Sequence, residues 1–302
     1  MEQEIYQIYD KIFKKILTLS GKAVINLING LFDTDYPIDS TIRYNWTEFV
    51  DDELRRILAD TIVTVNEEHS YHMEAQMTED ENIVFRVFDY EYAHANRYRV
   101  MGEEECELNF PEPKVIYLYS GKAPDEFRLK LNFGTQGSFT YRIPTFKFLE
   151  CTAEELNRKK MVILIPFALL KLRKIMEKER SAANLESLKK LIQDDILGNI
   201  NRNLEAGNIT VDDARKLKRQ TQMLYEHIYA HYEEMKELNE MTDESLMLDI
   251  DVIEKEQEKK EQEFLRQLEE KDEEIKSKDE EIKNKDKEIE KLKYRIEALT
   301  SK

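Results

Sequence analysis

The chain has 302 residues, of which 41% are hydrophobic and 36% charged, and its formal net charge is −17. Its longest apolar run, 161–170, contains a proline and is about half as long as a membrane-spanning helix, so an integral membrane protein is excluded. The acidic N-terminus has no apolar signal core, and the only two cysteines, Cys106 and Cys151, are far apart. We therefore expect a cytoplasmic chain in which both cysteines are reduced and buried.

The distribution of charge weighs against a nucleic-acid-binding protein. Residues 249–302 carry 14 basic and 19 acidic residues, so most of the net negative charge lies before them. Contact with DNA phosphates normally requires Lys and Arg. Basic clusters at 158–160, 171–180 and 215–219 could hold a DNA backbone, although a solvated helix face is the simpler interpretation of any one cluster.

The first 148 residues alternate between helical and strand patterns. Apolar residues between 5 and 19 recur every three or four positions and predict a helix, and a second helix is predicted over 22–32. A turn-rich stretch, 33–40, follows them. The further expectations are strands at 57–65 and 70–77 around a polar turn, a helix at 83–100, and strands at 115–119, 127–133 and 139–148.

From Thr152 the pattern is helical as far as about residue 239. Thr152 with Glu155 forms a capping-box sequence, and Thr210 with Asp213 marks another helix start. Gly198 and Gly207 are expected to break helices. We therefore divide the chain into a domain at 1–150, a helical domain at 151–245 and a tail at 246–302.

The tail has a seven-residue repeat. Isoleucine or leucine recurs at positions 268, 275, 282, 289 and 296, but lysine occupies three of the five positions that would complete a coiled-coil seam. Such a tail predicts a charged coiled coil that could pair two chains into a homodimer. A single solvated helix with Glu–Lys pairs is the alternative.

The hairpin predicted at 57–77 carries the residues with the clearest chemistry. A turn centred between positions 67 and 68 would pair residues whose numbers sum to about 135, which sets Asp60 opposite Ala75 and next to Glu74. Because side chains alternate along a strand, Glu74 and Gln76 share a face. Two nearby carboxylates repel each other unless they hold a proton or a cation, and oxygen ligands suit Mg²⁺ or Mn²⁺.

These residues resemble the D…ExK core of the PD-(D/E)XK nucleases, and more closely the recombination-promoting nuclease family, also described as YhgA-like transposases. The elements that carry the resemblance stand in order: Asp10 to Lys14 (DKIFK), Asp60, Glu74 to Gln76 (EAQ) and Arg86 to Tyr90 (RVFDY). The likeness covers roughly residues 6–120, with a looser one toward Leu172. Gln76 departs from the lysine of the superfamily and agrees with the closer family.

The resemblance implies an α/β restriction-endonuclease-like core, a mixed sheet flanked by helices, followed by the helical segment and the coiled-coil tail. It implies a metal-dependent DNA endonuclease linked to recombination or mobile DNA. Asp60 and Glu74 would then bind the metal, Gln76 would orient the attacking water and Asp10 would assist. Arg86 and Tyr90 would contact DNA or support the site.

Two alternatives remain at this point. The first is an inactive nuclease-fold protein that binds other proteins through its acidic surface and coiled-coil tail, which the net charge and the missing lysine favour. The second is an RNA-cutting or RNA-binding module on the same fold, although no RRM-like or KH-like pattern is present.

Overall fold

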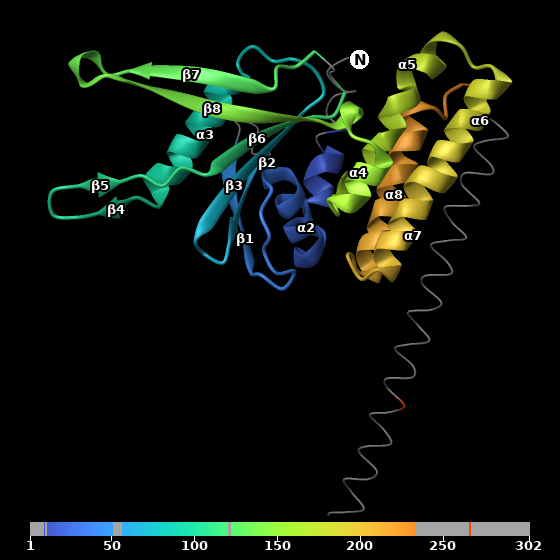
Figure 1. Cartoon of the computed structure of the whole chain (residues 1–302), viewed down its shortest axis with the longest axis horizontal. Coiled ribbons are helices and arrows are strands. Elements are labelled where there is room, and N and C mark those ends of the chain that lie inside the picture. Colours follow the sequence, from blue (N-terminus) through green and yellow to red (C-terminus); the bar gives the residue numbers. More distant parts are fainter. Residues whose placement is uncertain (1–8, 10, 51–55, 120–121, 233–265, 267–302) are drawn as a thin grey trace, which may run out of the picture. The chain divides into compact units, whose positions relative to one another are not determined.

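A computed structural model describes residues 9, 11–50, 56–119, 122–232 and 266, and for residues 46–50 and 56–60 it describes the backbone alone. The chain divides into two units, 1–247 and 248–302. All of the elements named below belong to the first unit (Figure 1). The predicted coiled-coil tail lies outside the described residues.

A six-stranded mixed sheet forms the centre of the first unit, in the order β1-β2-β3-β6-β8-β7. The first three strands form an antiparallel meander, β3, β6 and β8 run parallel, and β7 returns antiparallel to β8. The strands are β1 (Ile42–Val50), β2 (Arg56–Val65), β3 (His69–Gln76), β6 (Glu112–Tyr117), β7 (Glu126–Asn132) and β8 (Ser138–Lys147). A small separate hairpin consists of β4 (Val100–Met101) and β5 (Cys106–Glu107).

Helices cover both faces of this sheet. On one face, α2 (Gly21–Phe32) is buried along nine of its twelve residues, because its apolar side chains surround most of the helix. Its Gly30 lies against the backbone at residue 159, where a Cβ would come within 2.8 Å of the Lys159 carbonyl oxygen. On the other face, α3 (Ile83–Arg97) buries a stripe at three- and four-residue spacing that includes Val87 and Glu91.

The helical segment packs around one apolar run. Residues Val162–Leu169 form a 3-10 helix that is buried at every position and contacts the long helix α8 (Val211–Ile228) and α2. One continuous hydrophobic cluster therefore includes residues from both sides of position 150. The other helices are α4 (Ala153–Arg158), α5 (Leu170–Lys178), α6 (Ala182–Lys190), a π-helical turn at Leu191–Leu197, and α7 (Gly198–Glu205). No helix in the described part of the chain is both long and apolar enough to span a bilayer.

Most predicted elements are confirmed, with four corrections. The strand β1 was not predicted, because its apolar alternation runs only from Ile42 to Trp46 and the β-bulge after Trp46 interrupts it. Gly198 does not break a helix, since the π-helical turn continues through it into α7. Cys106 is exposed rather than buried, at the edge of the small hairpin. The fourth correction concerns the register of the central hairpin.

The capping boxes are confirmed at Thr152 and Thr210, and the second one has a further role. Asp213, whose side chain is buried, accepts hydrogen bonds from the Thr210 amide at 2.9 Å, the Ser20 amide at 2.8 Å and the Ser20 hydroxyl at 2.5 Å. Ser20 is itself the N-cap of α2. One carboxylate therefore joins the start of α8 to the start of α2.

We predict that Asp213→Ala lowers the free energy of unfolding by about 3 kcal/mol, because three donors lose a charged acceptor at a buried site. Urea unfolding followed by circular dichroism measures this loss. Asp212→Ala is the matched control, since Asp212 lies in the same helical turn but is exposed and pairs with Arg215 and Lys216 at the surface. Equal, small losses in both variants would contradict the proposed junction.

Candidate functional site

The β2–β3 hairpin is closed by a turn in which Asn66 and Glu67 both have positive φ, at 51° and 59°. The Glu68 amide donates to the Val65 carbonyl at 3.1 Å across this turn. The resulting register pairs residues whose numbers sum to 134, one less than predicted, and its last pair is Thr61 with Met73. Asp60 and Glu74 are the next residues of β2 and β3 beyond that pair.

A β-bulge marks this position on the other side of β2. Trp46 pairs with Thr61 and Thr47 pairs with Ala59, so the β1 ladder skips Asp60. Bulges of this kind are common beside active sites, where they redirect a residue. The side chain of Asp60 and the whole of Asp10 lie outside the described residues.

The side chains of Glu74 and Gln76 lie together on the α3 face of β3. Gln76 Nε2 donates to Glu74 Oε1 at 2.6 Å, and the Arg86 guanidinium forms a salt bridge with the same oxygen. Arg86 also binds Asp80 Oδ2 at 2.9 Å, just before α3 begins. The Glu74 side chain is only 12% exposed. The structure therefore brings together three residues predicted for the site, Glu74, Gln76 and Arg86.

A buried polar network holds α3 against the sheet beside this cluster. Glu91 is fully buried on α3, and its carboxylate lies 3.0 Å from His72 Nδ1 on β3 and accepts a hydrogen bond from the Tyr141 hydroxyl on β8. Burial raises the pKa of Glu91, although the neighbouring His72 opposes the rise. Since Arg86 is on the same helix, the network fixes its position relative to Glu74. Tyr90, next to Glu91, packs edge-on near the His72 ring, with centroids 6.4 Å apart.

Tyr117 is a further candidate residue that sequence analysis did not identify, because it lies within a continuous apolar run. It pairs with Gln76 in the parallel ladder. Its side chain is fully buried, yet its hydroxyl has no hydrogen-bond partner among the described residues. Burial raises the pKa of Tyr117 to about 12, and Asp80 and Glu79 add to the rise. An unpartnered buried hydroxyl beside Gln76 is suited to donate to a bound water or anion.

The donor atoms in this region suit a hard divalent cation. Glu74 supplies a carboxylate, Gln76 an amide oxygen, and position 60 an aspartate across the hairpin. Mg²⁺ and Mn²⁺ prefer such oxygen ligands, often with several waters retained. Within the described residues, no three His, Cys, Asp or Glu side chains gather as a metal-binding group. A cation here would therefore depend on Asp60 or Asp10 in addition to Glu74.

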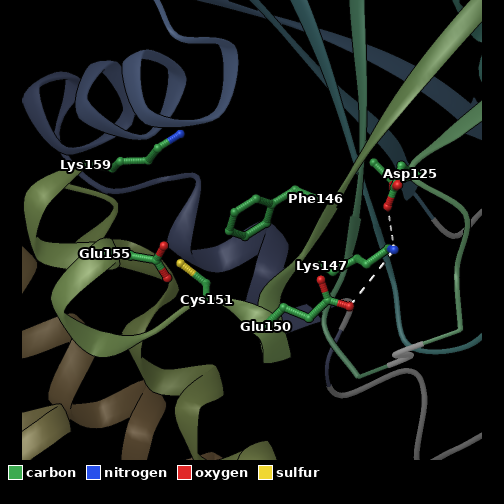
Figure 2. A pocket seen from close by; sticks show the side chains of 8 residues that line it. Asp125, Phe146, Lys147, Glu150, Cys151, Glu155 and Lys159 are labelled. Carbon is green, nitrogen blue, oxygen red and sulfur yellow. Dashed lines mark hydrogen bonds and ion pairs between the residues drawn. The ribbon is translucent and has the colours of Figure 1, made fainter.

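A separate pocket of about 270 Å³ opens near the end of β8 (Figure 2). It carries both signs of charge, and Lys147 in its wall pairs with Asp125 at 2.6 Å. Burial raises the pKa of the Cys151 thiol, so this cysteine is poorly suited to act as a nucleophile. We therefore do not assign the chemistry to this pocket.

The basic clusters of the helical segment are largely engaged within the protein. Lys159 pairs with Asp33 at 3.0 Å, Lys171 donates to the Cys151 carbonyl at 2.6 Å, and Lys216 pairs with Asp212 at 2.6 Å. Lys218 is almost fully buried. These helices are therefore less suited to bind a DNA backbone than their composition predicts.

The comparisons with known proteins give one match. The family described as "Putative transposase, YhgA-like" matches residues 7–207, about two thirds of the chain. Neither the curated proteins nor the solved structures include a match. The matched range contains Glu74, Gln76, Arg86 and position 60.

We predict a pH-dependent stability that comes from His94, which is 6% exposed on α3. Burial lowers its pKa to about 4, and the charges of Arg43, His72 and Arg97 lower it further. In the unfolded chain the pKa is near 6.5, so between pH 6.5 and 4 the unfolded state binds more protons. His94 should therefore cost about 3 kcal/mol of stability as the pH falls from 7 to 4.

Comparison of wild type with His94→Gln by urea unfolding at pH 7, 5.5 and 4 isolates this contribution. The difference between the two proteins is the relevant quantity, because the raised pKa of Glu91 changes stability in the opposite direction. We expect the variant to lose less stability on acidification than wild type. Parallel pH profiles for the two proteins would refute the role of His94.

Proposed function

The chain belongs to the YhgA-like transposase family, which links it to mobile DNA, and we propose on that premise that it is a metal-dependent DNA endonuclease. The observation that carries the proposal is the register of the β2–β3 hairpin. It pairs Thr61 with Met73, and one further step would set an aspartate across from the largely buried carboxylate of Glu74. Acids on adjacent strands are a common arrangement for a shared divalent cation.

In this proposal Asp60 and Glu74 would hold Mg²⁺ or Mn²⁺, and Asp10 would assist. The ion would polarise a phosphodiester oxygen and lower the pKa of a bound water. Gln76 would orient that water through its amide, which already fixes Glu74 Oε1 at 2.6 Å. Because an amide cannot take a proton at neutral pH, the proton of the water would pass to a substrate phosphate oxygen or to solvent.

Arg86 and Tyr117 would act on the substrate phosphate. The Arg86 guanidinium can turn from Glu74 toward a phosphate oxygen when a cation binds that carboxylate. The unpartnered Tyr117 hydroxyl would donate to the same phosphate or to the attacking water. Tyr90 on α3 would support the site by packing against His72 of β3 rather than by chemistry.

One observation favours the alternative of an inactive protein-binding relative. The Arg86 salt bridge already neutralises Glu74 without a metal, as a structural ion pair does. The net charge of −17 favours the same alternative, because it repels DNA at long range. A measurement of catalysis therefore distinguishes the two functions.

We predict that the full chain nicks supercoiled plasmid DNA with Mg²⁺ or Mn²⁺ and stops when EDTA is added. Asp60→Ala and Glu74→Ala should each lower the nicking rate at least about 100-fold, because each removes a metal ligand. Glu68→Ala is the matched control, since it removes an exposed acid from the same hairpin, and it should cleave like wild type. Equal nicking by all four proteins would remove the nuclease proposal, and faster cleavage of RNA would redirect it.

We predict that Tyr117→Phe separates activity from stability. The hydroxyl has no partner among the described side chains, so its removal should leave the free energy of unfolding unchanged or raise it by about 1 kcal/mol. The nicking rate should nevertheless fall roughly tenfold, because one donor to the reacting groups is lost. A variant that is destabilised and fully active would show that Tyr117 has only a structural role.

A further inference from the structure

The β7–β8 hairpin differs in charge from the rest of this acidic chain. Residues 127–149 contain no Asp or Glu, although acidic residues make up about one in five of the whole sequence. The same stretch contains four basic residues, Arg128, Lys130, Arg142 and Lys147. The hairpin therefore forms a positively charged element on a negatively charged protein.

The hairpin projects from the sheet as a two-stranded ribbon (Figure 1). β8 pairs with β6 only at Thr145–Lys147, whereas it pairs with β7 along all of Glu126–Asn132. The projecting part is seven residue pairs long, which corresponds to roughly 23 Å at the usual rise of a strand. Such a ribbon fits the major groove of B-DNA, which is about 12 Å wide.

The register gives the ribbon a basic face. Arg128 lies directly across from Arg142, and Lys130 is the next residue on the same face. Like charges directly opposite each other destabilise a sheet. The two arginines share the single carboxylate of Glu126, at 2.6 and 2.9 Å, and both remain more than half exposed. One carboxylate cannot neutralise both arginines and Lys130, so this face keeps a net positive charge that suits an anionic partner.

The opposite face and the tip are apolar. Near the base, Tyr141 packs against Phe88 of α3, with ring centroids 5.6 Å apart. Toward the tip, Phe133 and Phe139 are 56% and 60% exposed. Exposed aromatic rings at the end of a basic element are suited to contact bases while the basic residues contact phosphates.

The base of the ribbon lies beside the candidate site. The Phe127 ring is 6.4 Å from that of Tyr117, the residue that pairs with Gln76. DNA held along the ribbon would therefore be held next to the residues proposed for cleavage. The basic residues of the helical segment are less available to bind DNA, because several of them form ion pairs or hydrogen bonds within the protein.

We propose that the tip of the β7–β8 ribbon enters the major groove of duplex DNA, with Phe133 and Phe139 at the tip against the bases and with Arg128, Lys130 and Arg142 on the phosphates along one wall of the groove. This inference deepens the proposed function and rests on it in taking DNA as the substrate. It assigns the DNA contact to a sheet ribbon rather than to the basic helices.

The test measures binding of the full chain to a fluorescein-labelled 30-base-pair duplex by anisotropy, without divalent metal and over a series of salt concentrations. Omitting the metal separates binding from cleavage. The triple variant R128A/K130A/R142A should bind at least about tenfold more weakly, and the slope of log affinity against log salt should fall by about 2 to 3.

A control variant removes the same number of charges from the helical segment, as R158A/K160A/K178A, whose side chains are all exposed. Its affinity should stay within about threefold of wild type. A further variant, F133A/F139A, should weaken binding without changing the salt slope, because no phosphate contact is lost. Circular dichroism checks that each variant is folded.

Loss of affinity in the helix control with none in the ribbon variant would overturn the proposal. So would tighter binding of single-stranded RNA than of the duplex, or a ribbon variant that changes only self-association in sedimentation. If the ribbon variant alone loses DNA affinity while wild type fails to nick plasmid, the ribbon assignment stands and the nuclease proposal fails.

Discussion

The turn at Asn66–Glu68 sets the register of β2 against β3, and the candidate site depends on that register. Two consecutive residues with positive φ make the turn tight, and the Asn66 side chain accepts a hydrogen bond from the Thr41 amide at 3.1 Å, which ties it to the start of β1. Because side chains alternate along a strand, a slip of one residue would move every side chain of β3 to the other face. Glu74 would then face α2 and the apolar core instead of Arg86.

Glu74 is a largely buried carboxylate that is held by Arg86, and in the proposed function it would also bind a divalent cation. Arg86 provides a positive charge that belongs to the protein, and a divalent metal would replace it on binding. The Glu91 network limits where Arg86 can lie, since it anchors α3 to β3 and β8. In the proposed mechanism the site would need little rearrangement, because rotation of one guanidinium would expose the carboxylate and present a donor to the phosphate. The charge of the protein is also unevenly distributed. The body is acidic, whereas the β7–β8 ribbon, which starts beside the site, is basic.

Much of this arrangement follows from the sequence, for identifiable reasons. The β-branched run of β2, the apolar stripe of α3 and the Thr152 and Thr210 caps are local signals, and local signals predict local structure well. The likeness to the nuclease family then selected Glu74, Gln76 and Arg86, which the structure brings together. The predicted register pairs residues whose numbers sum to about 135, whereas the observed sum is 134. The difference arises because the loop length and the positive φ at Glu67 cannot be read from composition.

Other features depend on tertiary contacts and were not predictable. From the sequence, Tyr117 cannot be distinguished from an ordinary core residue. Only its pairing with Gln76 in the sheet places it beside the candidate site. The basic helices appeared suited to DNA because the partners of Lys159 and Lys171 lie far away in sequence or on the backbone. Residue propensities likewise do not predict the π-helical turn before Gly198. The predicted metal role of Asp60 and the assisting role of Asp10 remain predictions.

A crystal structure of the full chain grown with Mn²⁺ and examined by anomalous scattering tests the central claim most directly. The account predicts one ion bound by carboxylate oxygens of both Asp60 and Glu74, with the Arg86 guanidinium displaced from Glu74. An Arg86–Glu74 salt bridge that persists at saturating Mn²⁺, with no anomalous peak at the hairpin, would contradict it.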